Sequence, residues 1–144
     1  MIGLIQRVSE ASVVVDGKVT GEIDRGLLLL LGVEKADSRV NLDKLLNKTL
    51  NYRVFPDEKG HMNRSLLDVS GELLVVSQFT LAADTQKGLR PSFSSAAAPD
   101  LAQTLYDAFV HEASKQVNVA TGVFGADMKV SLINDGPVTF QLTA

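Results

Sequence analysis

The sequence predicts one mixed α/β domain, residues 1–144, with five or more strands and two helices. Runs of aliphatic and β-branched residues bounded by Gly, Pro, Asn and Asp recur along the chain, as in strands separated by turns. Two longer segments instead space their apolar residues three and four apart, which is typical of amphipathic helices. A chain of 144 residues is the size of one domain and can form a hydrophobic core without metals or disulfides.

The first third of the chain predicts three strands, at residues 2–15, 18–23 and 27–33. Asp16-Gly17 separates the first two, and this dipeptide between β-rich segments is a strong hairpin signal. Polar residues around Ser9 interrupt the first run, so we expect that strand to be bent or bulged there. The third run is almost entirely aliphatic, as in a central strand. Arg7 lies among apolar positions, and we expect it to be partly buried beside a carboxylate.

Two helices are predicted from the change of apolar period. The first follows Asp37-Ser38, which can cap it, and has about sixteen residues. Its apolar stripe is Val40, Leu42, Leu45, Leu46, Leu50 and Val54. The second begins at Pro99, a residue suited to a first helical turn. Its stripe is Leu101, Leu105, Ala108, Phe109 and Ala113. Between the two helices, a turn at residues 55–60 and a short strand or loop at 61–63 precede a further strand.

That further strand, residues 73–76, is fully aliphatic and therefore predicted to be buried on both faces. It runs directly into Ser77-Gln78-Phe79-Thr80, where hydroxyl and carboxamide groups follow the apolar run. Such groups donate and accept hydrogen bonds without carrying charge, so they suit a neutral or zwitterionic ligand. The alternative is that Ser77 and Thr80 bond only to nearby backbone, as most polar side chains do.

The C-terminal segment alternates apolar and polar residues over 128–132 and again over 138–142. This pattern predicts two half-buried strands joined by a turn at Asn134-Asp135-Gly136-Pro137, and hence an antiparallel hairpin at each end of the domain. Proline has no N–H and glycine has no Cβ, so Gly136-Pro137 can present bare carbonyl oxygens to a ligand. The general frequency of X-Pro isomers predicts a trans bond here.

Ser77-Gln78-Phe79-Thr80-Leu81 together with Asn134-Asp135-Gly136-Pro137-Val138-Thr139 resembles the motif pair of the D-aminoacyl-tRNA deacylases, also called D-tyrosyl-tRNA deacylases. The opening residues 1–8, Leu31-Gly32-Val33-Glu34, residues 90–94 and the overall length fit the same family. The resemblance therefore covers the whole chain.

This resemblance implies a curved, barrel-like, mixed and largely antiparallel sheet, with a smaller sheet and two helices packed against it. It implies a homodimer in which Gly136-Pro137, with a cis bond, reaches into the site of the neighbouring subunit. Ser77, Gln78, Phe79 and Thr80 are then the catalytic candidates. The substrate-binding candidates are Gly136, Pro137, Phe79, Met128 and Ala102. Considered alone, Ala102 is typical of an ordinary helix alanine.

The implied reaction is hydrolysis of the ester that joins a D-amino acid to the terminal adenosine of tRNA, a step in translation quality control. An aminoacyl ester is already activated, so positioning a water and stabilising an oxyanion can suffice. The sequence has no Gly-x-Ser-x-Gly elbow and no histidine near Ser77 or Thr80. Either Thr80 attacks as a nucleophile, for which no base is evident, or the terminal 2′-hydroxyl of the tRNA assists a water. We favour the second mechanism.

Composition narrows the classes of protein and partner. There is no cysteine, and His61 and His111 have no metal-ligand spacing, so no metal and no cofactor are expected. No window is long and apolar enough for a membrane span, and no signal peptide is evident, so a cytoplasmic location is expected. A net charge of −3 argues against a protein that grips long DNA or RNA through its backbone.

A small nucleic-acid footprint is still compatible with this charge. Lys87 and Arg90 lie in the Gly-, Ser- and Ala-rich segment 82–98, and they are our candidates for contacting the tRNA acceptor end. Arg53 and Arg64 are further candidates, and a solvated surface is the alternative for all four. A non-catalytic RNA-binding module and a small-molecule esterase that uses Thr80 remain the alternative functions.

Overall fold

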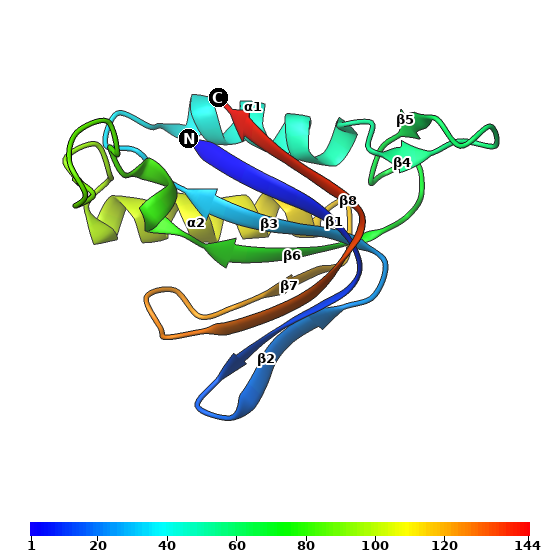
Figure 1. Cartoon of the computed structure of the whole chain (residues 1–144), viewed down its shortest axis with the longest axis horizontal. Helices are drawn as coiled ribbons and strands as arrows, with labels where there is room; N and C mark the ends of the chain where they lie inside the picture. Colours follow the sequence, from blue (N-terminus) through cyan, green and yellow to red (C-terminus); the bar gives the residue numbers. More distant parts are fainter.

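The computed structural model describes all residues from Met1 to Ala144 and is a mixed α/β domain. Its helices and strands are β1 (Ile2–Val15), β2 (Lys18–Ile23), β3 (Gly26–Gly32), α1 (Arg39–Asn51), β4 (Phe55–Pro56), β5 (Met62–Arg64), β6 (Glu72–Ser77), the 3-10 turn η1 (Phe79–Ala82), α2 (Pro99–Ser114), β7 (Val119–Thr121) and β8 (Lys129–Thr143). Figure 1 shows the strands curving around one another, with both helices on one side. None of the helices combines the length and the hydropathy of a membrane-spanning segment.

Strand β1 organises the sheet because it pairs with three other strands. Its first half pairs with β3, its second half pairs with β2, and β8 runs antiparallel along both halves. The pairing with β8 shifts register between Val8 and Glu10, so the predicted bulge near Ser9 is confirmed. The six-stranded sheet has the order β2-β1-β3-β6-β7, with β8 on β1. Because β2 also lies against β7, where Thr20 donates to the Thr121 carbonyl, the sheet is nearly closed into a barrel.

Strands β3 and β6 run parallel through the centre of the sheet, with Leu31 opposite Ser77 at their carboxyl ends. Alternate side chains of the two strands face two separate apolar clusters. Leu27, Leu29, Leu31, Leu73 and Val75 pack under the helices, whereas Leu28, Leu74 and Val76 fill the barrel interior. Burial on both faces is the reason that these strands are uninterrupted aliphatic runs.

The helices follow the predicted periods with three corrections. Ser38 caps α1, and its side chain accepts from the Val40 amide, whereas Asp37 has a different role described below. The helix is shorter than expected and ends at Asn51, so Val54 is buried beyond it. Val40 is 61% exposed and does not belong to the buried stripe. In α2, Leu105, Phe109 and Ala113 are buried as predicted, with Leu101 and Ala108 partly buried beside them.

The predicted C-terminal hairpin is wrong, because residues 129–143 form one continuous strand. Thr139 lies opposite Gln6 and Asn134 lies opposite Val8, so residues 135–138 bulge out opposite Arg7 alone. Alternating apolar and polar residues on both sides of a turn sequence predict a hairpin, but here the residues on both sides of the turn pair with β1. The Gly136–Pro137 peptide bond is cis, so the trans bond expected from the general X-Pro frequency is also wrong.

Strands β4 and β5 form the smaller, two-stranded sheet, in which residues 62–64 supply the predicted short strand. This sheet lies at the opposite end of the molecule from η1 and the loop that follows it (Figure 1). These positions matter because η1 carries Phe79 and Thr80 of the first motif, whereas the Gly136-Pro137 motif lies near the small sheet. Arg7, opposite the Gly136-Pro137 bulge, makes this proximity evident, because its Nη1 donates to the carbonyl of Val54, just before β4, at 2.6 Å.

Candidate functional site

The largest apolar cavity, about 710 Å³, opens where β3 and β6 end. Its lining residues come from these strand ends, η1, segment 93–99, α2 and the segment that leads into β8. They are Leu31, Val33, Val76, Ser77, Gln78, Phe79, Phe93, Ala96, Ala97, Ala98, Pro99, Ala102, Tyr106, Phe124, Gly125, Ala126, Met128 and Val130. Five of the candidate residues are therefore brought together here, namely Ser77, Gln78, Phe79, Met128 and Ala102.

The polar motif after β6 is held in a tight turn. The Gln78 amide donates to the Leu31 carbonyl at 2.8 Å, which extends the β3–β6 pairing by one residue. The Gln78 side-chain amide then donates to the Thr80 hydroxyl oxygen at 2.6 Å. Thr80 is exposed in η1, beside the cavity wall and not within it. Its hydroxyl has an amide as its neighbour and no base.

Two pairs of aromatic rings line the cavity. Phe79 and Phe93 lie 5.1 Å apart between ring centroids at its rim, where Phe79 is 60% exposed. Tyr106 and Phe124 lie 5.8 Å apart deeper in the cavity. Flat apolar rings of this kind can bind the face of a base or of another planar group. Sequence reasoning missed all three as site residues: Phe93 lies in segment 90–94, which fits the family but was not singled out, and Tyr106 and Phe124 lie in no motif.

Tyr106 is the only ionisable residue among those lining the cavity. Its hydroxyl donates to the Val75 carbonyl at 2.9 Å. Burial, with a smaller contribution from the charge of Asp107, raises the pKa of Tyr106 to about 12. The phenol therefore stays protonated at neutral pH and acts as a hydrogen-bond donor, so it cannot serve as a general base there.

Gly136 and Pro137 do not reach this cavity within the same chain. Across the sheet, the β8 bulge lies opposite Arg7 of β1, Arg7 pairs with Leu27 of β3, and Leu27 pairs with Leu73 of β6. Ser77 lies four residues beyond Leu73 along β6. Three strand spacings also separate β8 from β6. The two motifs are thus about 13 Å apart along the strands and about 14 Å apart across them. One chain alone cannot combine them around a single small ligand.

The bulge is nevertheless held firmly. The Val138 backbone amide donates to the Asn134 side-chain oxygen at 2.7 Å, and the Asn134 side-chain amide donates to the Thr139 hydroxyl oxygen at 2.9 Å. Arg7 Nε donates to the Asp135 carbonyl at 2.8 Å, with the Asp135 carboxylate 3.8 Å away. The expected partly buried Arg7 with a nearby carboxylate is confirmed. These bonds fix an exposed stretch of backbone that presents Gly136 and Pro137 to the outside.

The basic candidates lie in two places. Lys87 and Arg90 are exposed in a projecting loop closed by the Asp84–Ser92 backbone pair, next to Phe93 at the cavity rim. Arg53 donates to Asn63 of β5, and Arg64 of β5 is paired with Glu58, so both lie at or beside the small sheet and not at the cavity. Only Lys87 and Arg90 are therefore near the cavity of their own chain.

Comparison with known proteins decides the family. The family model described as D-Tyr-tRNA(Tyr) deacylase matches residues 4–143. The chain belongs to the D-aminoacyl-tRNA deacylase family. Relatives named D-aminoacyl-tRNA deacylase include one from Shewanella amazonensis, 64% identical, and one from Cellvibrio japonicus, 63% identical. The first match covers 99% of both chains, and the second covers 99% of this chain and 98% of its relative.

Solved structures give the same fold for this D-aminoacyl-tRNA deacylase. One, described as "c-Myc DNA Unwinding Element Binding Protein", is 40% identical with a TM-score of 0.95 and covers 100% of this chain and 99% of its own. A "probable eukaryotic D-amino acid tRNA deacylase" is 18% identical with a TM-score of 0.83, covers 98% of both chains and supports the fold alone. The predicted barrel-like sheet, smaller sheet and two helices are confirmed, as is a hydrolase that acts on aminoacyl-tRNA esters.

We predict that Tyr106→Phe lowers the free energy of unfolding of this deacylase by about 1–2 kcal/mol, because the buried Val75 carbonyl loses its donor. Since burial raises the pKa of Tyr106, the difference from the wild type persists below pH 10 and shrinks as the pH rises toward 12. Urea unfolding measures it. The matched control is Tyr52→Phe, at a ring that is 39% exposed in the single chain and whose hydroxyl makes no hydrogen bond there, with an expected change below about 0.5 kcal/mol. A loss of deacylation with unchanged stability would contradict this structural role.

Proposed function

We propose that this deacylase is a cytoplasmic homodimer that removes D-amino acids from tRNA and rejects L-aminoacyl esters. The observation that carries the proposal is an uncharged cavity that lacks Gly136-Pro137 of its own chain. In the proposed complex, the terminal adenosine and its ester occupy the cavity beside Phe79, Ala102 and Met128. Ser77, Gln78 and the backbone around Phe79 and Thr80 hold the ester.

A second copy of the chain supplies the missing part of the site. The separation of the two motifs along and across the sheet supports this, because no single chain can bring them together. Exposed apolar side chains beside the bulge support an interface there. Tyr52 and Phe140 lie 5.9 Å apart between ring centroids and are 39% and 38% exposed, and Met62 is 50% exposed. A two-fold arrangement of such faces places each bulge against the partner's cavity.

Chirality is the harder demand on the site, because D and L substrates carry the same groups in different directions from Cα. A flexible side-chain pocket can repack around either one, whereas fixed backbone cannot. The proposed selector is therefore the backbone of Gly136-Pro137, held by Asn134 and Arg7. Its carbonyl oxygens bind the α-ammonium group of the substrate, and an L side chain meets backbone atoms. Side chains of D-amino acids point away from the selector, so many are accepted.

The proposed chemistry uses the substrate's own hydroxyl. The cavity offers no base, and Thr80 has only the Gln78 amide as a polar side-chain neighbour. A Thr80 nucleophile would need a base to take its proton. The terminal 2′-hydroxyl of the tRNA instead orients and activates the attacking water, while uncharged donors around Phe79 and Thr80 stabilise the oxyanion. Lys87 and Arg90 contact phosphates of the acceptor end from the rim.

The function is tested by a deacylation assay with D-Tyr-tRNA, L-Tyr-tRNA, Gly-tRNA and a free D-tyrosine ester. We expect hydrolysis of the D-aminoacyl substrate, none of the L-substrate, and measurable hydrolysis of Gly-tRNA, because glycine has no side chain to exclude. The free ester should react poorly, since it lacks the adenosine. A protein that cleaved nothing would fit an RNA-binding module, and one indifferent to the tRNA would fit a simple esterase. Inactivity on Gly-tRNA alone would contradict selection by exclusion.

The mechanism is tested by removing each candidate hydroxyl in turn. We expect Thr80→Ala to lower the single-turnover rate by no more than about tenfold, because Thr80 only positions the substrate. A terminal 2′-deoxyadenosine should lower that rate by about 10²–10⁴, the range for a lost general acid–base group. Thr80→Ser is the control that keeps the hydroxyl. If Thr80→Ala abolished turnover with tRNA binding intact, the covalent mechanism would replace this one.

The shared site is tested by subunit complementation. Ala102→Phe fills the cavity, and Gly136→Val disrupts the bulge, where φ is +147° and an added Cβ would lie 2.6 Å from Val138 Cγ2. Each variant alone should be inactive. After mixing and exchange, half the dimers pair one of each, and each such dimer has one intact site. Activity should therefore return to about a quarter of the wild-type level. If verified heterodimers showed no recovery of activity, both motifs would have to act within one chain.

A further inference from the structure

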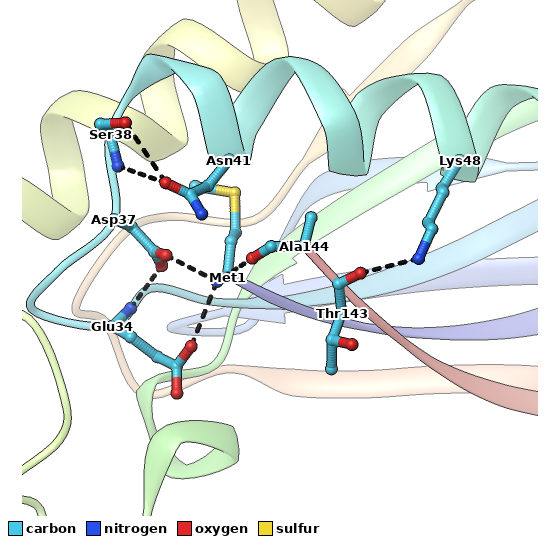
Figure 2. Close-up of polar contacts among 8 residues, drawn as sticks. All are labelled: Met1, Glu34, Asp37, Ser38, Asn41, Lys48, Thr143 and Ala144. Carbon is cyan, nitrogen blue, oxygen red and sulfur yellow. Dashed lines mark hydrogen bonds and ion pairs between the residues drawn. The ribbon is translucent and has the colours of Figure 1, made fainter.

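The α-ammonium group of Met1 is enclosed by three oxygen acceptors. It donates to Asp37 Oδ1 at 2.7 Å, to the Ala144 carbonyl at 2.8 Å and to Glu34 Oε2 at 3.2 Å (Figure 2). A protonated amine has three N–H donors, and all three are used here. The charge therefore has a complete set of partners.

This group is also shielded from solvent. Met1 is 1% exposed, and the side chain of Asp37 is 5% exposed, whereas that of Glu34 is 41% exposed. The second carboxylate oxygen of Asp37 accepts from the Glu34 amide at 2.7 Å. Asp37 thus joins the chain terminus to the turn that follows β3, which is why it is buried before α1 instead of capping that helix.

The same turn supports one wall of the catalytic cavity. The Lys35 amide donates to the Ser95 carbonyl at 3.1 Å, and the Ala97 amide donates to the Val33 carbonyl at 3.0 Å. Glu34 and Ala96 form the bridge between these two bonds. Val33, Ala96 and Ala97 all line the cavity. A short chain of contacts therefore runs from the amine through Asp37 and Glu34 to the cavity wall.

We propose that the free α-amine of Met1 is a structural cation that holds this wall in place, and that acylation of the amine is a modification that loosens the substrate site. A formyl or acetyl group would convert the ammonium into an uncharged amide with one N–H. Two of the three hydrogen bonds would be lost, and the buried Asp37 carboxylate would lose its counter-charge.

Removal of a formyl group by hydrolysis restores the ammonium and its three hydrogen bonds. Water adds to the formamide carbon, the C–N bond breaks, and formate and the amine are released. The amine takes up a proton and binds Asp37, Glu34 and the Ala144 carbonyl. The effect on stability is independent of the proposed function, whereas the effect on substrate binding rests on it.

The test compares N-formyl protein, made by expression with a deformylase inhibitor, with the free-amine protein. We expect the formyl group to lower the melting temperature by about 10 °C, as expected for breaking one buried ion pair in a domain of this size. In an Asp37→Asn background, the same modification should have less than half this effect, because the two changes remove one interaction. Glu34→Gln, at the more exposed partner, is the matched control and should change the melting temperature by less than about 3 °C.

Two further measurements use the formyl protein alone, in case Asp37→Asn does not fold. Hydrogen exchange should accelerate at the amides of Lys35 and Ala97 and stay unchanged at Val75 in the sheet centre. The KM for D-Tyr-tRNA should rise at least about threefold with kcat within twofold. A melting temperature within about 2 °C of the free-amine protein, full additivity with Asp37→Asn, or uniform loss of protection would overturn the proposal. Failure of the proposed function would instead remove turnover from both forms and leave the melting difference.

Discussion

The parallel pairing of β3 with β6 determines where the largest apolar cavity of this protein opens. Gly26 lies opposite Glu72 in this pairing, so close that an added Cβ would be 1.8 Å from the Glu72 carbonyl oxygen. Five residues later the two strands end together at Leu31 and Ser77. Ligand sites commonly lie beyond the carboxyl ends of parallel strands, where polar groups leave the core. Here the cavity opens at that edge, and the motif after Ser77 turns across it.

Much of the fold follows from local patterns in the sequence. The aliphatic runs at 27–33 and 73–76 predicted buried central strands, and the residues capping α1 and opening α2 marked helix starts correctly. The continuous β8 could not be predicted in this way, because its register is set by β1, which is more than one hundred residues away in the sequence. Of the residues that line the cavity, the sequence predicted only those that the family resemblance marked, namely Ser77, Gln78, Phe79, Ala102 and Met128. Phe93, Tyr106 and Phe124 meet there through tertiary packing, which leaves no spacing in the sequence.

Arg7 connects the β8 bulge to the segment that precedes the smaller sheet. It is the one residue of β1 that lies opposite the four-residue bulge, and its guanidinium donates to the Asp135 carbonyl within that bulge. The same side chain reaches the Val54 carbonyl, so the bulge is tied to the segment between α1 and the smaller sheet. Arginine suits this position because its planar group presents several donors in fixed directions. The exposed Gly136-Pro137 backbone is thus supported both by Arg7 of the neighbouring strand and by the Asn134 contacts within the bulge.

An uncharged cavity combined with a rigid external backbone would explain how a single small domain can act on a reactive ester and still discriminate handedness. A charged acid or base beside the ester would accelerate hydrolysis of any aminoacyl group that entered, whichever its configuration. When the chemistry instead depends on the substrate's own hydroxyl, the rate is limited to esters seated in one orientation, and rejection of the wrong orientation is sufficient for selectivity. Rejection is a steric and electrostatic property of fixed atoms, so it requires a support that does not relax when the wrong substrate arrives. The Asn134 and Arg7 contacts provide such a support in each chain, and in the proposed dimer the selecting backbone and the reacting ester would belong to different subunits.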